Sequence, residues 1–386
     1  MMKVSLLKKL FLIPIISTVL TACGNTSSIG VSSVSNLTST IESVSISTDD
    51  IASSTSEIVD KKIHEIHTPL QLAYLTSKDY DVAAAFAMGN KEESRPLPYR
   101  IEYEEYSLFK GEKEFEIEVS DSPDYVDAWV FKTNNTYFDI YNCKVHTKYY
   151  FRVCEDDIYI LEDTFETSKT LLRNIYIDGV TNARDLGGYQ TASGKMIKQG
   201  LLYRTARIND NYTSIANITK LGTEWVKRLG FKTELDLRTT SESGIASSLL
   251  ENMQYISCSW GYDKPGGIFA PENYPVIKDA FHALANKFNY PLFFHCNIGT
   301  DRTGTLALLT LSYLGVDYVN IIRDYLFSNF ATIGGTRGVS NMKPLLDLID
   351  TMEGNTLQEK VTTFLRTKIE VPEADLLAIK ELLLED

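Results

Sequence analysis

The chain has 386 residues, 44% of them hydrophobic and 23% charged, and a formal net charge of −13. Its length accommodates more than one domain with a buried core. The acidic balance excludes a general nucleic-acid binder, because such proteins gain most of their affinity by neutralising phosphates with Lys and Arg. We therefore expect any phosphate ligand to be held at a local site, and the composition leaves the oligomeric state open.

Residues 1–22 have the layout of a secretory signal peptide. Lys3, Lys8 and Lys9 precede an apolar run that ends in Leu-Thr-Ala-Cys23. The alternative, a transmembrane helix, is disfavoured because the apolar run is short for a bilayer span. The ending resembles the lipobox of bacterial lipoproteins. This resemblance implies a lipid on Cys23 and an extracytoplasmic protein anchored to the bacterial cell membrane.

The next segment, residues 23–57, is dominated by Ser and Thr with scattered single hydrophobes. A segment of this composition buries too little apolar surface to offset the entropy lost on ordering it. We expect it to be a flexible tether.

Residues 58–170 are predicted to form an all-β domain. Short alternating runs separated by turn residues occupy 99–106, 114–121, 127–133, 136–142, 149–156 and 163–168. This spacing is typical of an antiparallel β-sandwich. The stretch from Cys143 to Val153 resembles the tyrosine-corner region of fibronectin type III domains, with Tyr149 as the corner tyrosine. We interpret the aromatic side chains of these strands as core rather than as a carbohydrate-binding face.

The cysteines outside the signal lie in a compartment where disulfides form, under this interpretation. If the odd-numbered residues 149–153 face inward, strand alternation points Cys154 outward, whereas Cys143 takes a position that is buried in such domains. We expect no disulfide between the two, because β-carbon vectors must converge for a bond, although this pairing is the obvious alternative. Cys258 lies inside the strand-like run YISCSW and is interpreted as core.

Residues 171–386 alternate apolar strands with helical stretches, which predicts an α/β domain with a central, largely parallel sheet. Residues 291–295 have the composition of a buried strand, and residues 303–314 that of a buried helix. The loop between them joins the carboxyl end of a strand to the start of a helix. Such a loop turns backbone N–H groups inward and gains positive potential from the helix dipole, so it can hold an anion.

This loop places one cysteine and one arginine around the expected anion. A thiol beside an arginine at a helix N-terminus favours the thiolate, so Cys296 is a candidate nucleophile. The planar guanidinium of Arg302 can bind two phosphoryl oxygens, and the Thr303 hydroxyl can donate to the sulfur. We expect His295 to orient the loop, and no metal or organic cofactor to be needed. The predicted substrate-binding residues are Asn297, Ile298, Gly299, Thr300 and Asp301.

The pattern His-Cys-x5-Arg-Thr-Gly resembles the phosphate-binding loop of the protein tyrosine phosphatase superfamily. Upstream, Asn-Ala-Arg-Asp-Leu-Gly-Gly at 182–188 and Asp-Leu-Arg at 236–238 look like the bacterial tyrosine phosphatase family, which includes secreted enzymes acting on phosphotyrosine and phosphoinositides. The resemblance implies a phosphocysteine intermediate and a phosphorylated protein or small phosphoester as substrate. That family commonly has Lys where this chain has Thr300, which weakens the case for multiply phosphorylated inositides.

Charged residues in the upstream motifs have two interpretations. They can contact substrate directly, or they can form buried ion pairs that support the loop. We favour the second, because structural ion-pair networks use the same residue types. The supporting residues are Arg184, Asp185, Arg204, Asp236 and Arg238, with Glu242 beside them.

Two carboxylates are candidates for the acid that protonates the leaving oxygen. Asp263 ends the stretch Trp-Gly-Tyr-Asp, which looks like a counterpart of the mobile Trp-Pro-Asp loop of the superfamily. Asp301 lies inside the phosphate loop, but a carboxylate beside an arginine tends to stay ionised and is the poorer proton donor. We predict that Asp263 is the acid and that Asp301 holds the loop or positions water.

The sequence thus predicts a multidomain, lipid-anchored phosphomonoester hydrolase of the protein tyrosine phosphatase type, acting on extracytoplasmic substrates. A phosphoinositide or inositol-phosphate phosphatase is the first alternative, because the same loop serves those substrates. A non-enzymatic adhesion or phospho-ligand binding lipoprotein is the second, and the intact Cys296, Arg302 and Thr303 weigh against it. A rhodanese-type sulfurtransferase is more distant, since its loop usually has another length.

Overall fold

The structure is a computed structural model that describes residues 63–108, 113–209 and 217–385. The predicted signal peptide, Cys23 and the tether 23–57 lie outside the described residues. Within those ranges, none of the helices combines the length and apolar character needed to span a bilayer.

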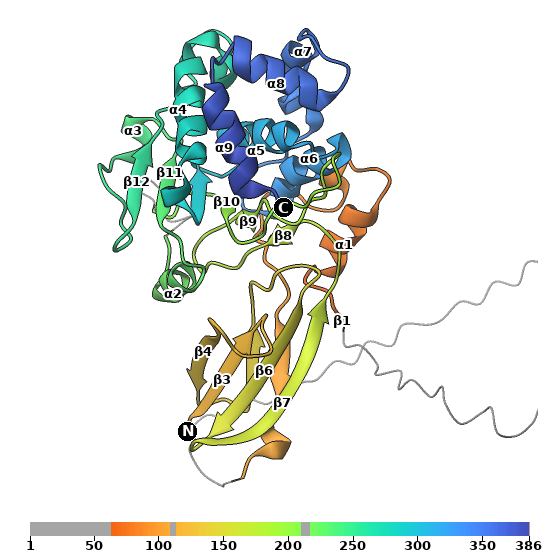
Figure 1. Ribbon diagram of the computed structural model, residues 1–386, viewed down its shortest axis with the longest axis vertical. Coiled ribbons are helices and arrows are strands. Elements are labelled where there is room, and N and C mark those ends of the chain that lie inside the picture. The colour runs from red at the N-terminus through yellow and green to blue at the C-terminus, as the bar shows by residue number, and fades with distance from the viewer. Residues whose placement is uncertain (1–62, 109–112, 210–216, 386) are drawn as a thin grey trace, which may run out of the picture. The chain divides into compact units, whose positions relative to one another are not determined.

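The β-rich part contains two sheets. Strands β3 (Phe115–Ser120), β4 (Trp129–Thr133), β6 (Lys148–Glu155) and β7 (Ile158–Thr167) pair antiparallel, and the short β1 (Ile63–His64) pairs parallel with β7, in the order β1-β7-β6-β3-β4. Figure 1 shows β3, β6 and β7 side by side. Strands β2 (Tyr99–Glu102) and β5 (Tyr137–Ile140) form the second sheet. All six predicted strand regions therefore contain a strand.

Residue Tyr149 has the contact expected of a corner tyrosine. Its side chain is buried, and its hydroxyl oxygen accepts a hydrogen bond from the backbone N–H of Lys144 at 2.8 Å. Cys143 is buried and Cys154 is half-buried, and both thiols are free. The resemblance to fibronectin type III domains stays a prediction.

The C-terminal part is built on a six-stranded sheet in the order β12-β11-β13-β10-β9-β8. The neighbouring strands β12 (Gln254–Ser257), β11 (Thr233–Asp236), β13 (Leu292–His295) and β10 (Leu202–Thr205) are parallel. Strands β9 (Arg184–Asp185) and β8 (Arg173–Asn174) add an antiparallel edge. The α/β class and the central, largely parallel sheet were predicted correctly.

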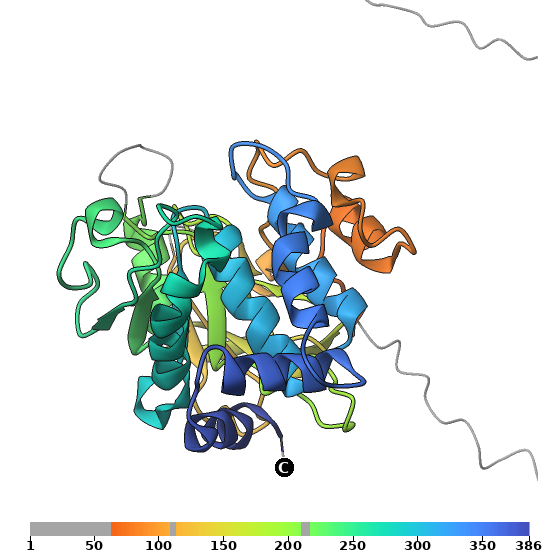
Figure 2. The ribbon, with the colours of Figure 1, turned by 90° about the horizontal axis from the view of Figure 1, so that it is seen from above.

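Helices cover this sheet. Helix α5 (Asp301–Leu314) is buried along its whole length after Asp301, because its side chains are almost all apolar or small. It contacts α6 (Tyr318–Leu326) and α8 (Leu357–Thr367), while α9 (Glu373–Leu383) packs on α4 (Tyr274–Ala285) (Figures 1 and 2). The remaining α-helices within residues 217–385 are α2 (Lys220–Arg228), α3 (Thr240–Ser243) and α7 (Lys343–Asp350).

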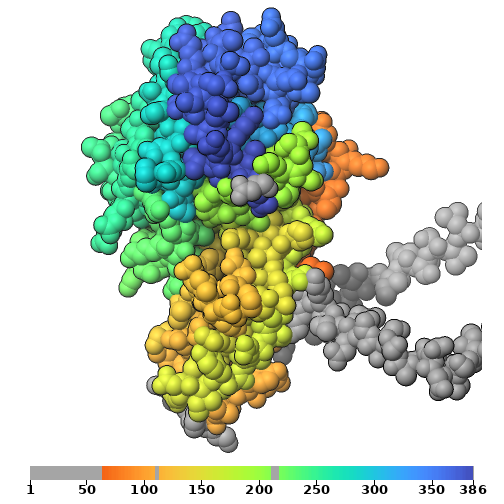
Figure 3. Space-filling view, viewed as in Figure 1, coloured from red at the N-terminus to blue at the C-terminus, as the bar shows by residue number. Residues whose placement is uncertain are grey.

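The last residues of the chain form backbone hydrogen bonds with residues 196–198, which precede β10. The N–H of Lys198 donates to the carbonyl of Leu383 at 2.8 Å, and the N–H of Glu385 donates to Met196. Figure 3 shows the dark blue C-terminal segment next to the green surface of this region.

Residues 69–95, inside the predicted limits 58–170 of the sandwich, pack on the α/β part. Helix α1 (Pro69–Thr76) begins with a capping box between Thr68 and Gln71. Its Tyr74 and Leu75 join the hydrophobic core that contains β13 and α5. In the opposite direction, Trp225 of α2 belongs to the hydrophobic core of the β-rich part. Side chains thus cross between the two parts in both directions, and the predicted domain limits stay a prediction.

Candidate active site

The phosphate-binding loop predicted from the sequence joins β13 to α5 at the carboxyl edge of the parallel strands. Gly299 has a φ of +67°, and a β-carbon there would lie 2.4 Å from the carbonyl oxygen of Thr205, at the end of β10. Both facts require glycine, since the obstructing atoms are backbone. The neighbouring strand therefore sets the path of the loop.

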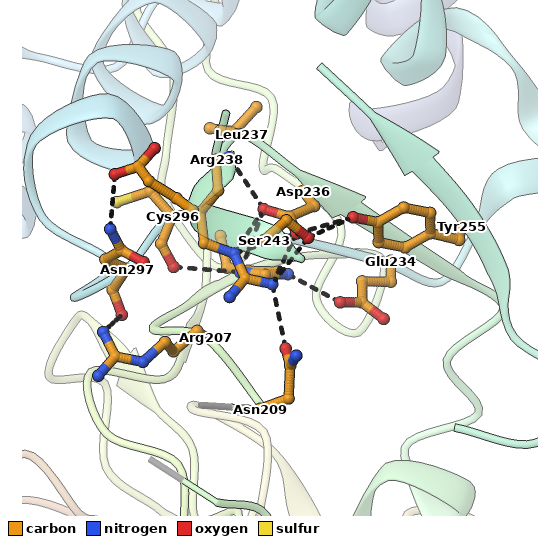
Figure 4. Close-up of polar contacts among 12 residues, drawn as sticks. Arg207, Asn209, Glu234, Asp236, Leu237, Arg238, Ser243, Tyr255, Cys296 and Asn297 are labelled. Atoms are coloured by element: carbon orange, nitrogen blue, oxygen red, sulfur yellow. Dashed lines mark hydrogen bonds and ion pairs between the residues drawn. The ribbon is translucent and has the colours of Figure 1, made fainter. Parts of the chain in front are cut away.

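Carbonyl oxygens of this loop are bound on its outer side. Arg204 donates to the carbonyl of Gly299 at 2.8 Å, and Asn182 donates to the carbonyls of Ile298 and Gly299 at 2.9 and 3.1 Å. The N–H of Arg207 donates to the carbonyl of Asn297 at 3.1 Å, and the guanidinium of Arg207 donates to the same carbonyl at 3.4 Å (Figure 4). With its carbonyls turned outward, the loop has its N–H groups available for an anion.

Cys296 follows β13 directly and is 2% exposed. Burial of the thiol acts to raise its pKa, but the Arg302 guanidinium and hydrogen bonds from the hydroxyl and N–H of Thr303 outweigh it, so the pKa of Cys296 is lowered. The hydroxyl of Thr303 is buried and finds no nitrogen or oxygen partner among the described residues. The sulfur of Cys296 is therefore the one group left to accept from this hydroxyl among the described residues.

Arg302 is held rigidly in the first turn of α5. Its two terminal nitrogens donate to the carboxylate of Glu242 at 2.6 and 3.0 Å, and Nη1 also donates to the carbonyl of Trp260 at 2.9 Å. The ring of Tyr262 lies against the guanidinium, 4.8 Å from its central carbon. The Nε atom is buried and without a partner in the described residues. The guanidinium is thus fixed in orientation with a donor left over for a ligand.

Behind the loop lies a buried network around His295, and Figure 4 shows Glu234, Asp236 and Arg238 of this network. Its Nε2 is 2.9 Å from Glu234, and its Nδ1 is 3.1 Å from the carbonyl of Cys296. Although burial opposes protonation, the Asp236 and Glu234 carboxylates raise the pKa of His295. Ligand atoms of these three side chains lie within 4.8 Å of one another. Asp236 is already paired with Arg238 at 2.7 Å, and this cation disfavours a metal ion there.

The other predicted supporting residues also form buried ion pairs. Asp324 binds Arg184 at 2.7 Å through one carboxylate oxygen and Arg204 through the other. Asp185 binds Arg173 at 2.6 Å. Because Arg204 of β10 also donates to the loop, this network connects β9 and α6 to the loop through Arg204.

Each of the two candidate acids is paired with a neighbouring cation. Asp263 is mostly exposed and pairs with Lys264 at 2.9 Å, and this neighbouring ammonium lowers the pKa of Asp263. Asp301 accepts two hydrogen bonds from Arg337, at 3.0 and 3.2 Å. The charge of Asp301 acts to raise the pKa of Cys296. The choice of acid stays a prediction.

Thr300 does not face outward. Its side chain is fully buried, and its hydroxyl donates to the carbonyl of Ile298 at 3.2 Å and accepts from Asn182 at 3.3 Å. The position that carries a lysine in the resembled family is therefore used here to support the loop.

Sequence reasoning missed three contacts of the site. Glu242 was grouped with the scaffolding, whereas it forms a bidentate pair with Arg302 and accepts from Asn297 at 2.7 Å. Tyr262 and Arg337 were not identified. The only available signal for Tyr262 was its place beside Asp263, and the glycine-rich segment around Arg337 carries none.

Comparison with known proteins bears on this loop and its supports. Residues 175–385, more than half of the chain, match the tyrosine phosphatase family. The chain belongs to the tyrosine phosphatase family. Cys296, Arg302 and all the supporting ion pairs except the arginine partner of Asp185 lie in the matched range.

Two curated relatives are named tyrosine-protein phosphatases. One from Cupriavidus necator is 32% identical over 179 residues, which are 40% of this chain and 63% of that protein. One from Nostoc commune is 26% identical over 135 residues, which are 30% of this chain and 46% of that protein. The chain therefore spans less than two thirds of the length of either relative.

Two solved structures were also similar. Pseudomonas aeruginosa TpbA in complex with phosphotyrosine is 13% identical, with a TM-score of 0.26 over 49% of this chain and 89% of that chain. The catalytic domain of the PP-IP phosphatase SIW14 from Saccharomyces cerevisiae is 13% identical, with a TM-score of 0.27 over 46% and 91%. At these scores they add nothing to the fold described above.

Proposed function

We propose that this protein is a cysteine-dependent phosphomonoester hydrolase of the tyrosine phosphatase type. The observation that carries the proposal is the buried thiol of Cys296 with its lowered pKa, beside an arginine that has a free buried donor. In the first step the thiolate attacks phosphorus, a sulfur–phosphorus bond forms, and the bond to the leaving oxygen breaks. In the second step water attacks the phosphocysteine, and the sulfur leaves again as thiolate, stabilised by Thr303.

Arg302 and the loop N–H groups stabilise the charge that spreads over the phosphoryl oxygens in both steps. Glu242 takes two of the arginine's donors, so the guanidinium does not have to be ordered when substrate binds. Such preorganised groups lower the barrier without a reorganisation cost. The leaving oxygen takes its proton from a carboxylic acid, and Asp263 remains our assignment for it.

Phosphotyrosine is the substrate class that we favour. The ring of Tyr262 is half-exposed beside Arg302 and Cys296 and offers an apolar face to an aryl phosphate. With a buried Thr at position 300, the loop lacks at that position the additional cation that a multiply phosphorylated inositide would favour. The names of the two curated relatives agree with this class.

We also propose that the enzyme works outside the cytoplasm and is held at the membrane by a lipid attached to Cys23. The support is the arrangement of lysines, apolar run and Leu-Thr-Ala-Cys at the N-terminus. Replacing Cys23 with Ala should release the protein from the membrane fraction without loss of activity in detergent. A variant that stays in the membrane would contradict the anchor.

A substrate panel tests the proposed activity. Purified protein is assayed for phosphate release from nitrophenyl phosphate, a phosphotyrosyl peptide, a phosphoseryl peptide, a soluble inositol phosphate and a phosphoinositide. We expect turnover of the aryl phosphates and the highest kcat/KM for the phosphotyrosyl peptide. A higher kcat/KM for either inositol substrate would favour a phosphoinositide or inositol-phosphate phosphatase. No turnover of any of the five substrates would favour a non-enzymatic phospho-ligand binding protein.

A further inference from the structure

Residues 65–95 lie outside the matched family range and are separated from it in sequence by the β-sandwich, yet they contact elements that support the phosphate loop. We propose that this segment completes the active site by clamping the loop that carries Arg337, and that Arg337 is the positioning residue for Asp301. The proposal deepens the proposed function and rests on it, because Asp301 is placed within the phosphate loop.

The contact between Arg337 and Asp301 is a two-point one. Nε and Nη2 of Arg337 donate to the two carboxylate oxygens at 3.0 and 3.2 Å, and both side chains are only about one-fifth exposed. A bidentate pair fixes the plane of the carboxylate, which a single contact does not. The Tyr325 hydroxyl adds a longer contact of 3.4 Å to the same carboxylate. Asp301 is therefore held in one orientation within the phosphate loop that carries Cys296.

Arg337 is itself fixed through its backbone. Asn329, at the end of α6 and its following turn, accepts from the N–H of Arg337 at 2.8 Å and donates to its carbonyl at 3.0 Å. The same stretch is tied to Gly89: the N–H of Gly89 donates to the carbonyl of Asn329 at 2.7 Å, and its carbonyl accepts from Ile333 and Gly335 at 3.0 and 3.2 Å. Three backbone hydrogen bonds thus connect one glycine to both ends of the stretch leading to Arg337.

Gly89 is the residue that this contact requires. Its φ is +66°, and a β-carbon there would lie 1.7 Å from the carbonyl oxygen of Gly335. Because the obstructing atom is backbone, a larger residue has to move one of the two segments. The position of the Arg337 loop is therefore sensitive to the segment that contains Gly89.

The same N-terminal segment reaches the phosphate loop by a second route. The hydroxyl of Ser94 accepts from the N–H of Asn182 at 3.3 Å, and the side chain of Asn182 binds the carbonyls on the outer side of the loop. The carbonyl of Ser94 accepts from Asn174 at 2.9 Å, and Gln71 of α1 donates to the carbonyls on either side of Ser94. Both routes end at the loop around Cys296.

A double-mutant cycle on the full chain tests the positioning role. Wild type, Asp301→Asn, Arg337→Met and the double variant are assayed for kcat and KM on nitrophenyl phosphate. We expect Arg337→Met to lower kcat by about 10- to 100-fold with little change in KM, since Asp301 is expected to hold the loop or position the water of the second step, and misplacing such a group by an ångström can cost that much. In the Asp301→Asn background we expect less than about a twofold further loss, because the two residues then act as a unit. Equal losses in both backgrounds would overturn the positioning role.

The same four proteins are compared by the pH dependence of Cys296 alkylation with iodoacetamide, which needs no turnover. With Asp301 present, loss of Arg337 removes a positive charge and also frees the carboxylate from its fixed orientation, so the pKa of Cys296 should rise. With Asn at 301 only the positive charge is lost, so the pKa should rise less. If wild type turns over no phosphoester, the proposed function fails. The alkylation cycle still decides the positioning role, because an equal change in the pKa of Cys296 in both backgrounds would overturn it.

The clamp is tested with Gly89→Ala. We expect it to reproduce the loss of kcat and the raised pKa of Cys296 seen in Arg337→Met. Gly194→Ala is the matched control, because Gly194 also has a positive φ, of +84°, but nothing lies within 4 Å of its added β-carbon. Equal activity of the two variants would overturn the clamp. If Gly89→Ala does not fold, Ser94→Ala is tested instead. We expect its kcat to fall several-fold, and a kcat equal to that of wild type would overturn the clamp.

Discussion

Replacing Gly299 with Ala tests whether the path of the phosphate loop is set by its contact with β10. The new β-carbon would lie 2.4 to 2.7 Å from three backbone atoms of Thr205 and Ala206, and none of these can rotate away. The positive φ costs about 1 kcal/mol for a residue with a side chain, and overpacking adds about 1 to 3 kcal/mol. We therefore expect the free energy of unfolding to fall by about 2 to 4 kcal/mol.

Function should suffer as well, because the loop can relieve the clash only by moving away from Thr205 and from the Arg204 donor. A displacement of about 1 Å lowers kcat/KM by about 100-fold. The matched control is Gly230→Ala, since Gly230 has a φ of +70° and open space around the added β-carbon. Chemical denaturation and nitrophenyl phosphate kinetics are measured for both variants. If Gly299→Ala is as stable and as active as Gly230→Ala, the loop is not fixed by β10.

Three further results are expected. Arg302→Lys should be severely impaired in kcat/KM on nitrophenyl phosphate, because an ammonium cannot make the bidentate contacts of a guanidinium, and near-normal kinetics would remove Arg302 from the site. Alkylation by iodoacetamide, monitored by peptide mass spectrometry as a function of pH, should reach half its maximal rate at a lower pH for Cys296 than for Cys154. The reason is that the pKa of Cys296 is lowered, whereas partial burial raises the pKa of Cys154. The reverse order would contradict an activated thiol at Cys296. Asp263→Asn should slow hydrolysis of an alkyl phosphate far more than that of nitrophenyl phosphate, whose leaving group needs no proton, and if Asp301→Asn shows this dependence instead, the acid is Asp301.

The elements that the sequence predicted well are those whose signal is local. Alternating side chains predicted the strands of the β-rich part, and the strand, loop and helix around Cys296 follow from the single stretch 291–314. Helix α1 shows the opposite case. Its Tyr74 and Leu75 are buried against a core formed by residues far away in sequence, and no periodicity within the helix identifies that partner.

The same distinction applies to the site. The motif placed Cys296, Arg302 and Thr303 in one loop because their spacing is fixed by that loop. Arg337 lies 36 residues from Asp301 in a glycine-rich stretch, so only the fold brings the two together. Side-chain orientation was also beyond the sequence, since the pairing of Asp263 with Lys264 depends on rotamers that no pattern reveals.

The central claim is that phosphate passes through Cys296, and trapping the intermediate tests it most directly. The enzyme is mixed with nitrophenyl phosphate, quenched in acid during turnover, digested and analysed by mass spectrometry. We predict one phosphoryl group on the sulfur of Cys296, and no phosphorylated peptide and no turnover in Cys296→Ser. Steady turnover with the phosphoryl group on another residue, or turnover that survives in Cys296→Ser, would contradict the account.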